Sequence, residues 1–431
     1  MHRISRSTQL DETGGSRIET GSLVPMDGCP EGIGLSPCTA TPGAQHLGQT
    51  WKPTVNRPRI GFDVRYINDR YHGIGRYAFN LVKELGRLAP EIQFVLFTGK
   101  GTNTRFKLET MANCPNVEFT HGPWPLFWPT EHLLWPGILR KYAVDLFHTP
   151  YFAIPLTSQV PKFLTIHDLI FERFPGYMPD RWAMPYYRSL TSGGMQQAAR
   201  VITISQATAE DIRKYYRVPD QKIRVIPEGV DPVFQPIQDP SIKARAREQY
   251  FLQEPFILSV GARRPHKNLS RLVKAFSMVA PMIDHDLVFI GPADRRFPDE
   301  AYRAAIELQM IGRVRFLNWV PEEDLSTLYS LADLVVIPSL VEGFGLPALE
   351  AMACGTPVVA SNRSALPEVV SKAGLLVDPE DENDLSRAIY DILKDQGLWL
   401  KMSVAGLKRA ADFSWGKTAQ AMLRVYQEIL A

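Results

Sequence analysis

The sequence has few cysteines, no long apolar run and almost no net charge, and each shortage excludes a class of protein. The chain of 431 residues holds only 4 cysteines. They form neither a CxxC pair nor a zinc-type spacing with histidine, which favours a reducing compartment and argues against a structural metal site. No apolar run approaches the roughly 18 residues that a membrane span needs, and the N-terminus lacks a compact apolar signal core with a cleavage site. We therefore expect a soluble, cytoplasmic protein.

Charge is nearly balanced, with 48 basic and 46 acidic side chains and a formal net charge of +2. Such a balance gives no large electrostatic surface for nucleic acid, so we expect no nucleic-acid partner and a ligand that is bound locally. Hydrophobic residues make up 45% of the chain, which is enough apolar material for two globular cores.

Residues 1–57 contain no Phe or Tyr and one Trp, among many Gly, Ser, Thr and Pro residues. Such a segment buries too little apolar area to offset the entropy of ordering, so we expect a flexible leader. A start codon assigned too far upstream would leave the same composition, and both explanations stay open.

From Arg59 onwards, short apolar runs alternate with helical periodicity, as in successive βαβ units. Ser205 is placed to cap the N-terminus of one of these helices. The rhythm predicts a first domain over residues 58–235, with strands at 60–65, 94–97, 145–148, 162–166, 201–204 and 223–226.

The periodicity lapses around residues 228–254, where prolines and mixed charge indicate a linker. A second domain follows over residues 236–413, with strands predicted at 256–261, 287–291, 314–318, 334–338, 357–360 and 374–377. Both halves predict an α/β fold with a doubly wound parallel sheet, and in such sheets ligands bind beyond the carboxyl ends of the strands.

The most informative stretch is the sequence EGFGLPALE in the second domain. Gly343 and Gly345 lie in a loop that opens onto a short helix over 348–353, where free amides and the helix dipole favour an anion. Glu342 and Glu350 flank this position and would bracket a ligand that carries phosphate between hydroxyl-bearing groups, as a nucleotide sugar does. The alternative is that the glycines only make a turn and that Glu350 only favours an early helical turn.

Glu342 and Glu350 are eight positions apart, and AMACGTPVVAS follows them. This pattern resembles the EX7E signature of the retaining GT-B glycosyltransferases of family 4, and the resemblance runs from about Arg59 to the C-terminus. It implies two Rossmann-like domains that face a cleft, with a C-terminal helix over 414–431 that crosses back to the first domain.

The resemblance also implies roles for residues of the second domain. Glu342 would lie beside the donor sugar and Glu350 would bind the ribose hydroxyls of the nucleotide. The loop between them would bind the sugar and the diphosphate through Gly343, Phe344, Gly345 and Leu346.

A second phosphate contact is expected in the sequence SVGARRPHKNL. Lys267 matches the family lysine that holds the diphosphate and stabilises the leaving group. The usual family arginine is replaced by Ala262, and we expect Arg263, or else Arg264, to supply the missing charge. The alternative is that both arginines are solvated side chains of the loop.

In the first domain, the strand at 162–166 ends at His167 and Asp168. The resemblance implies that His167 contacts hydroxyls of the donor sugar, and that Asp168 fixes the loop or the ring. Gly73 and Gly75 match the family's N-terminal glycine loop, and Arg76 would reach the diphosphate or the acceptor unless it is a surface charge.

Taken together, these features predict a retaining hexosyltransferase with catalytic residues His167, Lys267 and Glu342. It resembles bacterial mannosyltransferases of polysaccharide and O-antigen synthesis, so GDP-mannose is the first expected donor and a UDP-sugar, carrying glucose or GlcNAc, is the second. No Asp-x-Asp motif stands beside the diphosphate site, and we expect neither a metal nor a cofactor. A GT-B sugar-nucleotide epimerase and a non-catalytic nucleotide-sugar sensor are the competing functions.

The expected acceptor is a saccharide, free or linked to a lipid. Aromatic side chains that would touch a membrane peripherally, or else line the core or the acceptor cleft, are Trp124, Phe127, Trp128, Trp135 and Trp182. Glu228, in VIPEGVD, stands where many relatives carry Asn, with no role assigned by the sequence.

Overall fold

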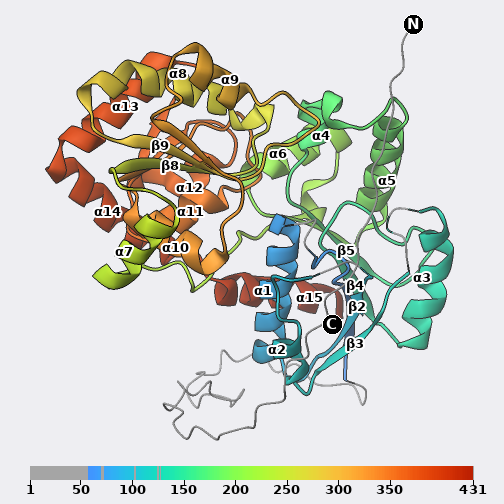
Figure 1. Cartoon of the computed structure of the whole chain (residues 1–431). Helices are drawn as coiled ribbons and strands as arrows, with labels where there is room; N and C mark the ends of the chain where they lie inside the picture. Colours follow the sequence, from blue (N-terminus) through green and yellow to red (C-terminus); the bar gives the residue numbers. More distant parts are fainter. Residues whose placement is uncertain (1–56, 69–71, 101–102, 124–125, 127, 431) are drawn as a thin grey trace, which may run out of the picture. The chain divides into compact units, whose positions relative to one another are not determined.

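The computed structural model describes residues 57–68, 72–100, 103–123, 126 and 128–430 (Figure 1). Nearly all of the expected leader lies outside these residues, as do Trp124 and Phe127. The described part is built on two parallel β-sheets with helices on their faces, which confirms the predicted α/β class.

The first sheet has seven strands within the described residues, in the order β3-β2-β1-β4-β5-β6-β7. Their bounds are β1 Arg59–Asp63, β2 Gln93–Thr98, β3 Val117–His121, β4 Leu146–Thr149, β5 Lys162–Ile166, β6 Arg200–Thr203 and β7 Ile223–Val225. The helices are α1 His72–Leu88, α2 Glu109–Ala112, α3 Thr130–Lys141, α4 Ile170–Arg173, α5 Ala183–Gln197 and α6 Gln206–Tyr216, with 3-10 turns η1 Pro175–Tyr177 and η2 Asp220–Lys222. The strands β2, β4 and β5 are short and almost wholly buried because helices cover the sheet on either side, whereas β3, which was not predicted, is only half-buried.

The second sheet has six strands within the described residues, in the order β10-β9-β8-β11-β12-β13. Their bounds are β8 Phe256–Val260, β9 Asp286–Ile290, β10 Val314–Leu317, β11 Leu334–Ile337, β12 Val358–Ser361 and β13 Leu375–Val377. The helices are α8 Leu269–Val279, α9 Glu300–Glu307, α10 Glu322–Leu331, α11 Leu346–Ala353, α12 Leu366–Val370, α13 Glu382–Lys394 and α14 Gln396–Ala410. The 3-10 turns are η3 Pro265–Lys267, η4 Ala280–Met282 and η5 Ser371–Ala373.

Both sheets reverse their strand order beside their first strand, between β1 and β4 and between β8 and β11. Such a reversal leaves a crevice at the carboxyl ends of the strands because the loops on its two sides run to opposite faces. The doubly wound topology was predicted, and it fixes where the ligand sites of this protein should lie.

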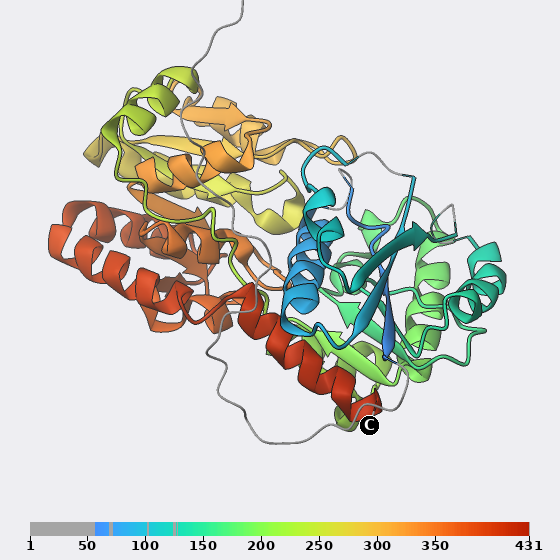
Figure 2. The ribbon, with the colours of Figure 1, turned by 90° about the horizontal axis from the view of Figure 1, so that it is seen from below.

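The chain crosses between the two sheets twice. The first crossing follows β7, and the second leads into α15, Trp415–Leu430, which packs against α1 of the first sheet (Figure 2). The crossings lie side by side: Val230 pairs with Ser414, and the Thr418 hydroxyl donates to the Pro227 carbonyl at 2.8 Å. The expected C-terminal helix that returns to the first domain is therefore confirmed.

The segment expected to be an irregular linker contains a further helix, α7, Pro240–Gln249. The Asp239 carboxylate accepts from the Ser241 amide at 2.8 Å as its N-cap, and Pro240 is its first residue. An Asp-Pro pair is a known helix-start signal, but α7 buries only Ala246 of its ten residues, so the sequence shows no apolar stripe there.

Candidate active site

The residues predicted to bind the ligand collect where β8 and β11 end, beside the reversal of the second sheet. The loop after β8 carries Lys267 and the loop after β11 carries Glu342. The backbone amide of Leu340 donates to the carbonyl of His266 at 2.8 Å, which ties the two loops together. Asn268 strengthens the tie, since its side-chain amide donates to the Pro338 carbonyl at 3.1 Å.

Lys267 and Glu342 form an ion pair, with Nζ at 2.7 Å from Oε1. The same carboxylate oxygen accepts from the Ser339 hydroxyl at 2.6 Å. Ser364 holds the backbone of Glu342, because its hydroxyl donates to the Glu342 carbonyl at 2.7 Å. Both charged side chains are mostly buried, with 17% and 11% of their surface exposed, so their orientation is fixed by the protein. An ammonium has three N–H donors, and this pair uses one of them.

The glycine loop lies directly against the first domain. A Cβ at Gly343 would lie 2.2 Å from the carbonyl oxygen of His167, which no side chain can tolerate. The Thr208 hydroxyl, at the start of α6, reaches the carbonyls of His167 and Gly343 at 3.2 and 3.4 Å. Gly345 adopts φ +115°, a conformation that favours glycine, and α11 begins at the next residue. The loop thus brings the start of α11 close to His167.

Glu350 lies on α11 and its side chain is 4% exposed. One carboxylate oxygen accepts from the Tyr329 hydroxyl at 2.8 Å, and the other is paired with Arg76 of α1. Arg76 also pairs with Glu322 at the start of α10. Two acidic residues of the second domain therefore share one cation of the first domain.

The His167 ring is held on both nitrogens. Nε2 lies 3.0 Å from the Pro150 carbonyl oxygen, and Nδ1 lies 3.2 Å from a carboxylate oxygen of Glu228. The edge of the ring meets Tyr77, with the centroids 4.7 Å apart. Both ring nitrogens therefore already have a protein partner. The contact of His167 with hydroxyls of the donor sugar stays a prediction.

Asp168 follows His167 at the mouth of the same loop. Its carboxylate accepts from the Ile170 amide at 3.0 Å, so it caps the turn into α4 and fixes the loop. Protein atoms crowd around this carboxylate and raise its pKa, while it keeps contact with solvent. Lys267 and Glu342 both act on the Asp168 carboxylate electrostatically, which places the β5 loop opposite the Lys267–Glu342 pair.

Two family models match the chain. The model described as Glycosyltransferase Family 4 covers residues 71–234, and the one described as Glycosyl transferases group 1 covers residues 241–409. The O-antigen chain mannosyltransferase B of Escherichia coli is 32% identical over 389 residues, which are 86% of this chain and 99% of that protein. The chain belongs to the group 1 glycosyltransferases.

Other relatives and solved structures agree with this assignment. The O-antigen chain mannosyltransferase RfbU of Salmonella typhimurium is 32% identical over 62% of this glycosyltransferase and 71% of the relative. Sucrose-phosphate synthase of Thermosynechococcus elongatus superposes with a TM-score of 0.67 at 25% identity, over 87% of this chain and 99% of that one. The fold of Anabaena HepE, at 20% identity, superposes with a TM-score of 0.68 over 86% and 100% of the two chains. The two-domain GT-B fold is thereby confirmed.

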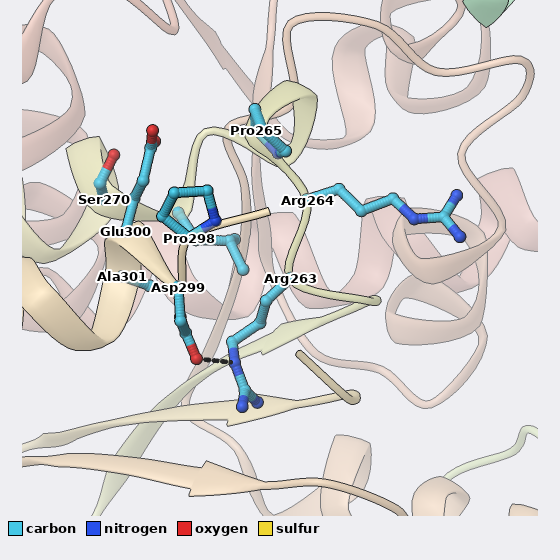
Figure 3. Close-up of a pocket in the computed structure, with 9 residues that line it drawn as sticks. Arg263, Arg264, Pro265, Ser270, Pro298, Asp299, Glu300 and Ala301 are labelled. Atoms are coloured by element: carbon cyan, nitrogen blue, oxygen red, sulfur yellow. Dashed lines mark hydrogen bonds and ion pairs between the residues drawn. The ribbon is translucent and has the colours of Figure 1, made fainter. Parts of the chain in front are cut away.

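In the glycosyltransferase, the two arginines after Ala262 bond to groups of the segment that follows β9. The Arg263 guanidinium donates to Asp299 at 2.9 Å (Figure 3). It also donates to the Gly291 carbonyl at 2.6 Å, and Arg264 pairs with Asp294 at 2.9 Å. The two side chains point in different directions, and Arg263 is 9% exposed. Both guanidinium groups are thus paired with carboxylates, and the replacement of the family arginine by Arg263, or else Arg264, stays a prediction.

The other predicted binding residues of the glycosyltransferase lie either in the hydrophobic core or in the first turn of α1. Phe344 is buried and packs against Phe413, so its side chain belongs to the core, and Leu346 packs against the same core. Gly73 and Gly75 lie in the first turn of α1. A Cβ at Gly75 would lie 3.1 Å from the Tyr66 carbonyl, whereas Gly73 has open space around it. Within these loops, the backbone and the charged side chains are therefore what a ligand would meet.

A contact that sequence reasoning missed joins the two domains beside Lys267. The Tyr177 hydroxyl accepts from the His266 amide at 3.0 Å and bonds to Nδ1 of the same residue at 2.9 Å. Burial lowers the pKa of His266 to about 2, so the ring is neutral. Tyr177 and His266 are 89 residues apart, and no sequence pattern near either residue indicates the contact.

Among the described residues, no helix is long and apolar enough to cross a membrane. In the same part of the chain, no group of three or more His, Cys, Asp or Glu side chains has an arrangement that would hold a metal ion.

Proposed function

We propose that the enzyme is a retaining mannosyltransferase that transfers mannose from GDP-mannose to a growing polysaccharide and forms an α-linkage. One observation carries this proposal. The Lys267–Glu342 pair, the glycine loop and Glu350 stand at the reversal of the second sheet and face the His167 loop of the first domain. The two relatives described above are O-antigen mannosyltransferases, which supports mannose as the sugar and a polysaccharide as the product.

In this proposal, each group has a role that follows from its charge and position. The ammonium of Lys267 keeps two N–H donors for the diphosphate, and it stabilises the negative charge that grows there as the glycosidic bond breaks. Glu342 orients that ammonium and lies beside the sugar. Glu350 accepts hydrogen bonds from the ribose. The backbone amides of the glycine loop and the positive end of the α11 dipole bind the phosphates.

The reaction needs no nucleophile from the protein. The bond between the anomeric carbon and the leaving phosphate oxygen breaks, and a bond forms from the same face to an acceptor hydroxyl oxygen. The acceptor proton passes to the departing phosphate oxygen, so atoms and charge balance. The protein contributes positioning and leaving-group stabilisation, with Lys267 and the start of α11 in place of a cation.

The donor is tested by thermal-shift measurements without added metal, against GDP-mannose, GDP-fucose, UDP-glucose, UDP-GlcNAc, GDP and UDP. We expect stabilisation by GDP-mannose and GDP that Lys267→Ala and Glu350→Ala both remove. Lys274→Ala is the matched control, because Lys274 is an exposed lysine of α8 that pairs with Glu382. A shift with UDP compounds only would replace GDP-mannose by a UDP-sugar, and the absence of any shift would refute the proposal.

The competing functions differ in turnover. An epimerase would convert the nucleotide sugar with no acceptor present, and a sensor would bind it with neither transfer nor hydrolysis. Mass spectrometry of the donor after incubation with and without an oligomannoside acceptor separates the three. We expect release of the nucleoside diphosphate that increases when acceptor is added.

We further propose that the acceptor is linked to a lipid and that the first domain touches the membrane surface. Of the aromatic residues predicted for such a contact, Trp135 is buried in the core, whereas Trp128 and Trp182 are 59% and 70% exposed. Leu133, on α3, is 74% exposed. Co-sedimentation with liposomes that contain anionic lipid should fall for Leu133→Ser with Trp182→Ser, and equal pelleting of this variant would contradict the membrane contact.

A further inference from the structure

Arg76 is the residue through which the first domain reaches the carboxylates of the second. It lies in the second turn of α1, and its guanidinium pairs with Glu350 on α11 and with Glu322 at the start of α10. Arg76, Glu322 and Glu350 thus form one ion cluster, in which Glu322 and Glu350 lie 246 and 274 positions after Arg76 in the sequence.

The surroundings of this cluster keep the guanidinium in place. The Arg76 side chain is 17% exposed, and its guanidinium carbon lies 5.6 Å from the centre of the Phe234 ring. Asn80 is next along the same helix face, and its amide donates to the Arg76 carbonyl at 3.2 Å. Burial raises the pKa of Glu322, and the positive charge of Arg76 opposes that rise. Without Arg76, two poorly solvated carboxylates would face each other with no cation between them.

Glu350 keeps part of its hydrogen-bonding capacity in this arrangement. A carboxylate offers about four lone-pair positions. Tyr329 and Arg76 each occupy one, on different oxygens, so the carboxylate is fixed in rotation and two positions remain. A carboxylate held in this way is ready to accept two neighbouring hydroxyls, as a ribose presents them.

We propose that Arg76 is a positioning residue of the donor site, which holds Glu350 in the orientation that accepts the ribose hydroxyls. Donor affinity then depends on the first domain as well as the second, because the residue that orients Glu350 comes from α1. This inference rests on the proposed function, since it takes Glu350 to be the ribose ligand. From the sequence alone, Arg76 was either a ligand contact or a surface charge. The proposal gives it a positioning role instead.

The test compares GDP with 2′,3′-dideoxy-GDP, which lacks both ribose hydroxyls, by calorimetric titration of the full chain. The intact protein should bind the dideoxy compound at least about tenfold more weakly, the lower limit for loss of one hydrogen bond to a charged group. Arg76→Ala should weaken GDP by a similar factor and leave the affinity for dideoxy-GDP unchanged. Arg76→Lys should restore part of the loss.

Glu322→Gln is the matched control, because it removes the other cross-domain pair of Arg76 and leaves Glu350 untouched. We expect its GDP affinity to stay within about threefold of the intact protein, as for a side chain that does not orient the ligand group. If Arg76→Ala weakens GDP and dideoxy-GDP equally, Arg76 acts on the structure in general and the proposal is wrong.

The failure of this inference is distinguishable from failure of the proposed function. If Lys267→Ala abolishes GDP binding and Arg76→Ala does not change it, the diphosphate site stands and the role of Arg76 is refuted. If the intact chain binds no GDP, the same comparison is made with UDP and dideoxy-UDP, and absence of binding to both nucleotides refutes the function and the inference together.

Discussion

Replacement of Gly343 by alanine tests the contact between the glycine loop and the first domain most directly. The added Cβ would lie 2.2 Å from the carbonyl oxygen of His167 and 3.0 Å from its carbonyl carbon. Both are backbone atoms, so no side-chain rotation relieves the clash. The β5 loop and the β11 loop must move apart for Gly343→Ala to fold.

The size of this movement follows from ordinary contact distances. Close carbon–oxygen contacts in proteins lie at about 3.3–3.6 Å. Starting from 2.2 Å, the two loops must separate by at least about 1 Å. A misplacement of about 1 Å between reacting groups can reduce the rate about 100-fold. Insertion of one methyl group into a packed contact costs about 1–3 kcal/mol of folding free energy.

We therefore expect Gly343→Ala to lose about 100-fold in donor turnover while it remains folded, since each domain keeps its own core. Turnover is measured as nucleoside diphosphate released from the sugar donor, and stability as the midpoint of urea unfolding. Gly312→Ala is the control, because a Cβ there meets no atom within 4 Å. Full turnover by Gly343→Ala, with an unchanged midpoint, would show that the active form does not contain this close contact.

Three further predictions concern stability and are checked by urea unfolding. Arg65→Ala removes a buried guanidinium that bonds two carboxylates and should cost about 3–5 kcal/mol, whereas Arg87→Ala, in an exposed pair, should cost under about 0.5 kcal/mol. Burial lowers the pKa of His148 to about 3 and that of His266 to about 2. The unfolded chain binds these two protons below about pH 6.5 and the folded chain does not, so stability should fall with decreasing pH, by up to about 2.7 kcal/mol per pH unit. Glu368→Ala removes the carboxylate that accepts from the first two amides of α6 and should cost about 1 kcal/mol.

Most strands were predictable from sequence because the central apolar runs are buried on both faces, whereas β3 is only half-buried and was not predicted. Helices with a weak apolar stripe were harder to predict. In α3, Pro136 interrupts the pattern and Leu133 and Leu134 point to solvent, so periodicity gave no clear signal there. The N-cap Ser205 of α6 was predicted and is confirmed, since its hydroxyl accepts from the Thr208 amide at 3.1 Å.

The candidate site was predictable where its residues share a loop or adjoining loops. Lys267 and Glu342 follow the neighbouring strands β8 and β11, so their pairing agrees with the predicted ligand site beyond the carboxyl ends of the strands. The surroundings of Arg263 were not predictable, because its backbone pairs with Ala293 in an isolated bridge outside the strands and its side chain bonds to Asp299. No rule of spacing reveals such a bridge.

Glu228 shows what topology adds to sequence. It lies 61 residues after His167, yet both follow strands of the same parallel sheet, at the edge where the carboxyl ends meet. A buried carboxylate at that edge needs a donor, because an unpaired buried charge is costly. The nearest polar group is Nδ1 of His167, 3.2 Å from a Glu228 carboxylate oxygen. Glu228 is therefore one of the two groups that hold the His167 ring.

Contacts between the two sheets are the part that sequence patterns do not encode. Hydrophobic periodicity specifies each sheet against its own helices, and it carries no information on how one sheet is turned against the other. The residue types nevertheless constrain the answer. Arg76 lies on the mainly buried face of α1, and a buried guanidinium must find carboxylates, which α10 and α11 provide. Gly343 permits the approach that this pairing requires, since any larger residue would keep the loops apart. The same contact between the domains thus depends on two features. The ion pairs of Arg76 attract the domains to each other, and the absence of a side chain at Gly343 leaves the space for their approach.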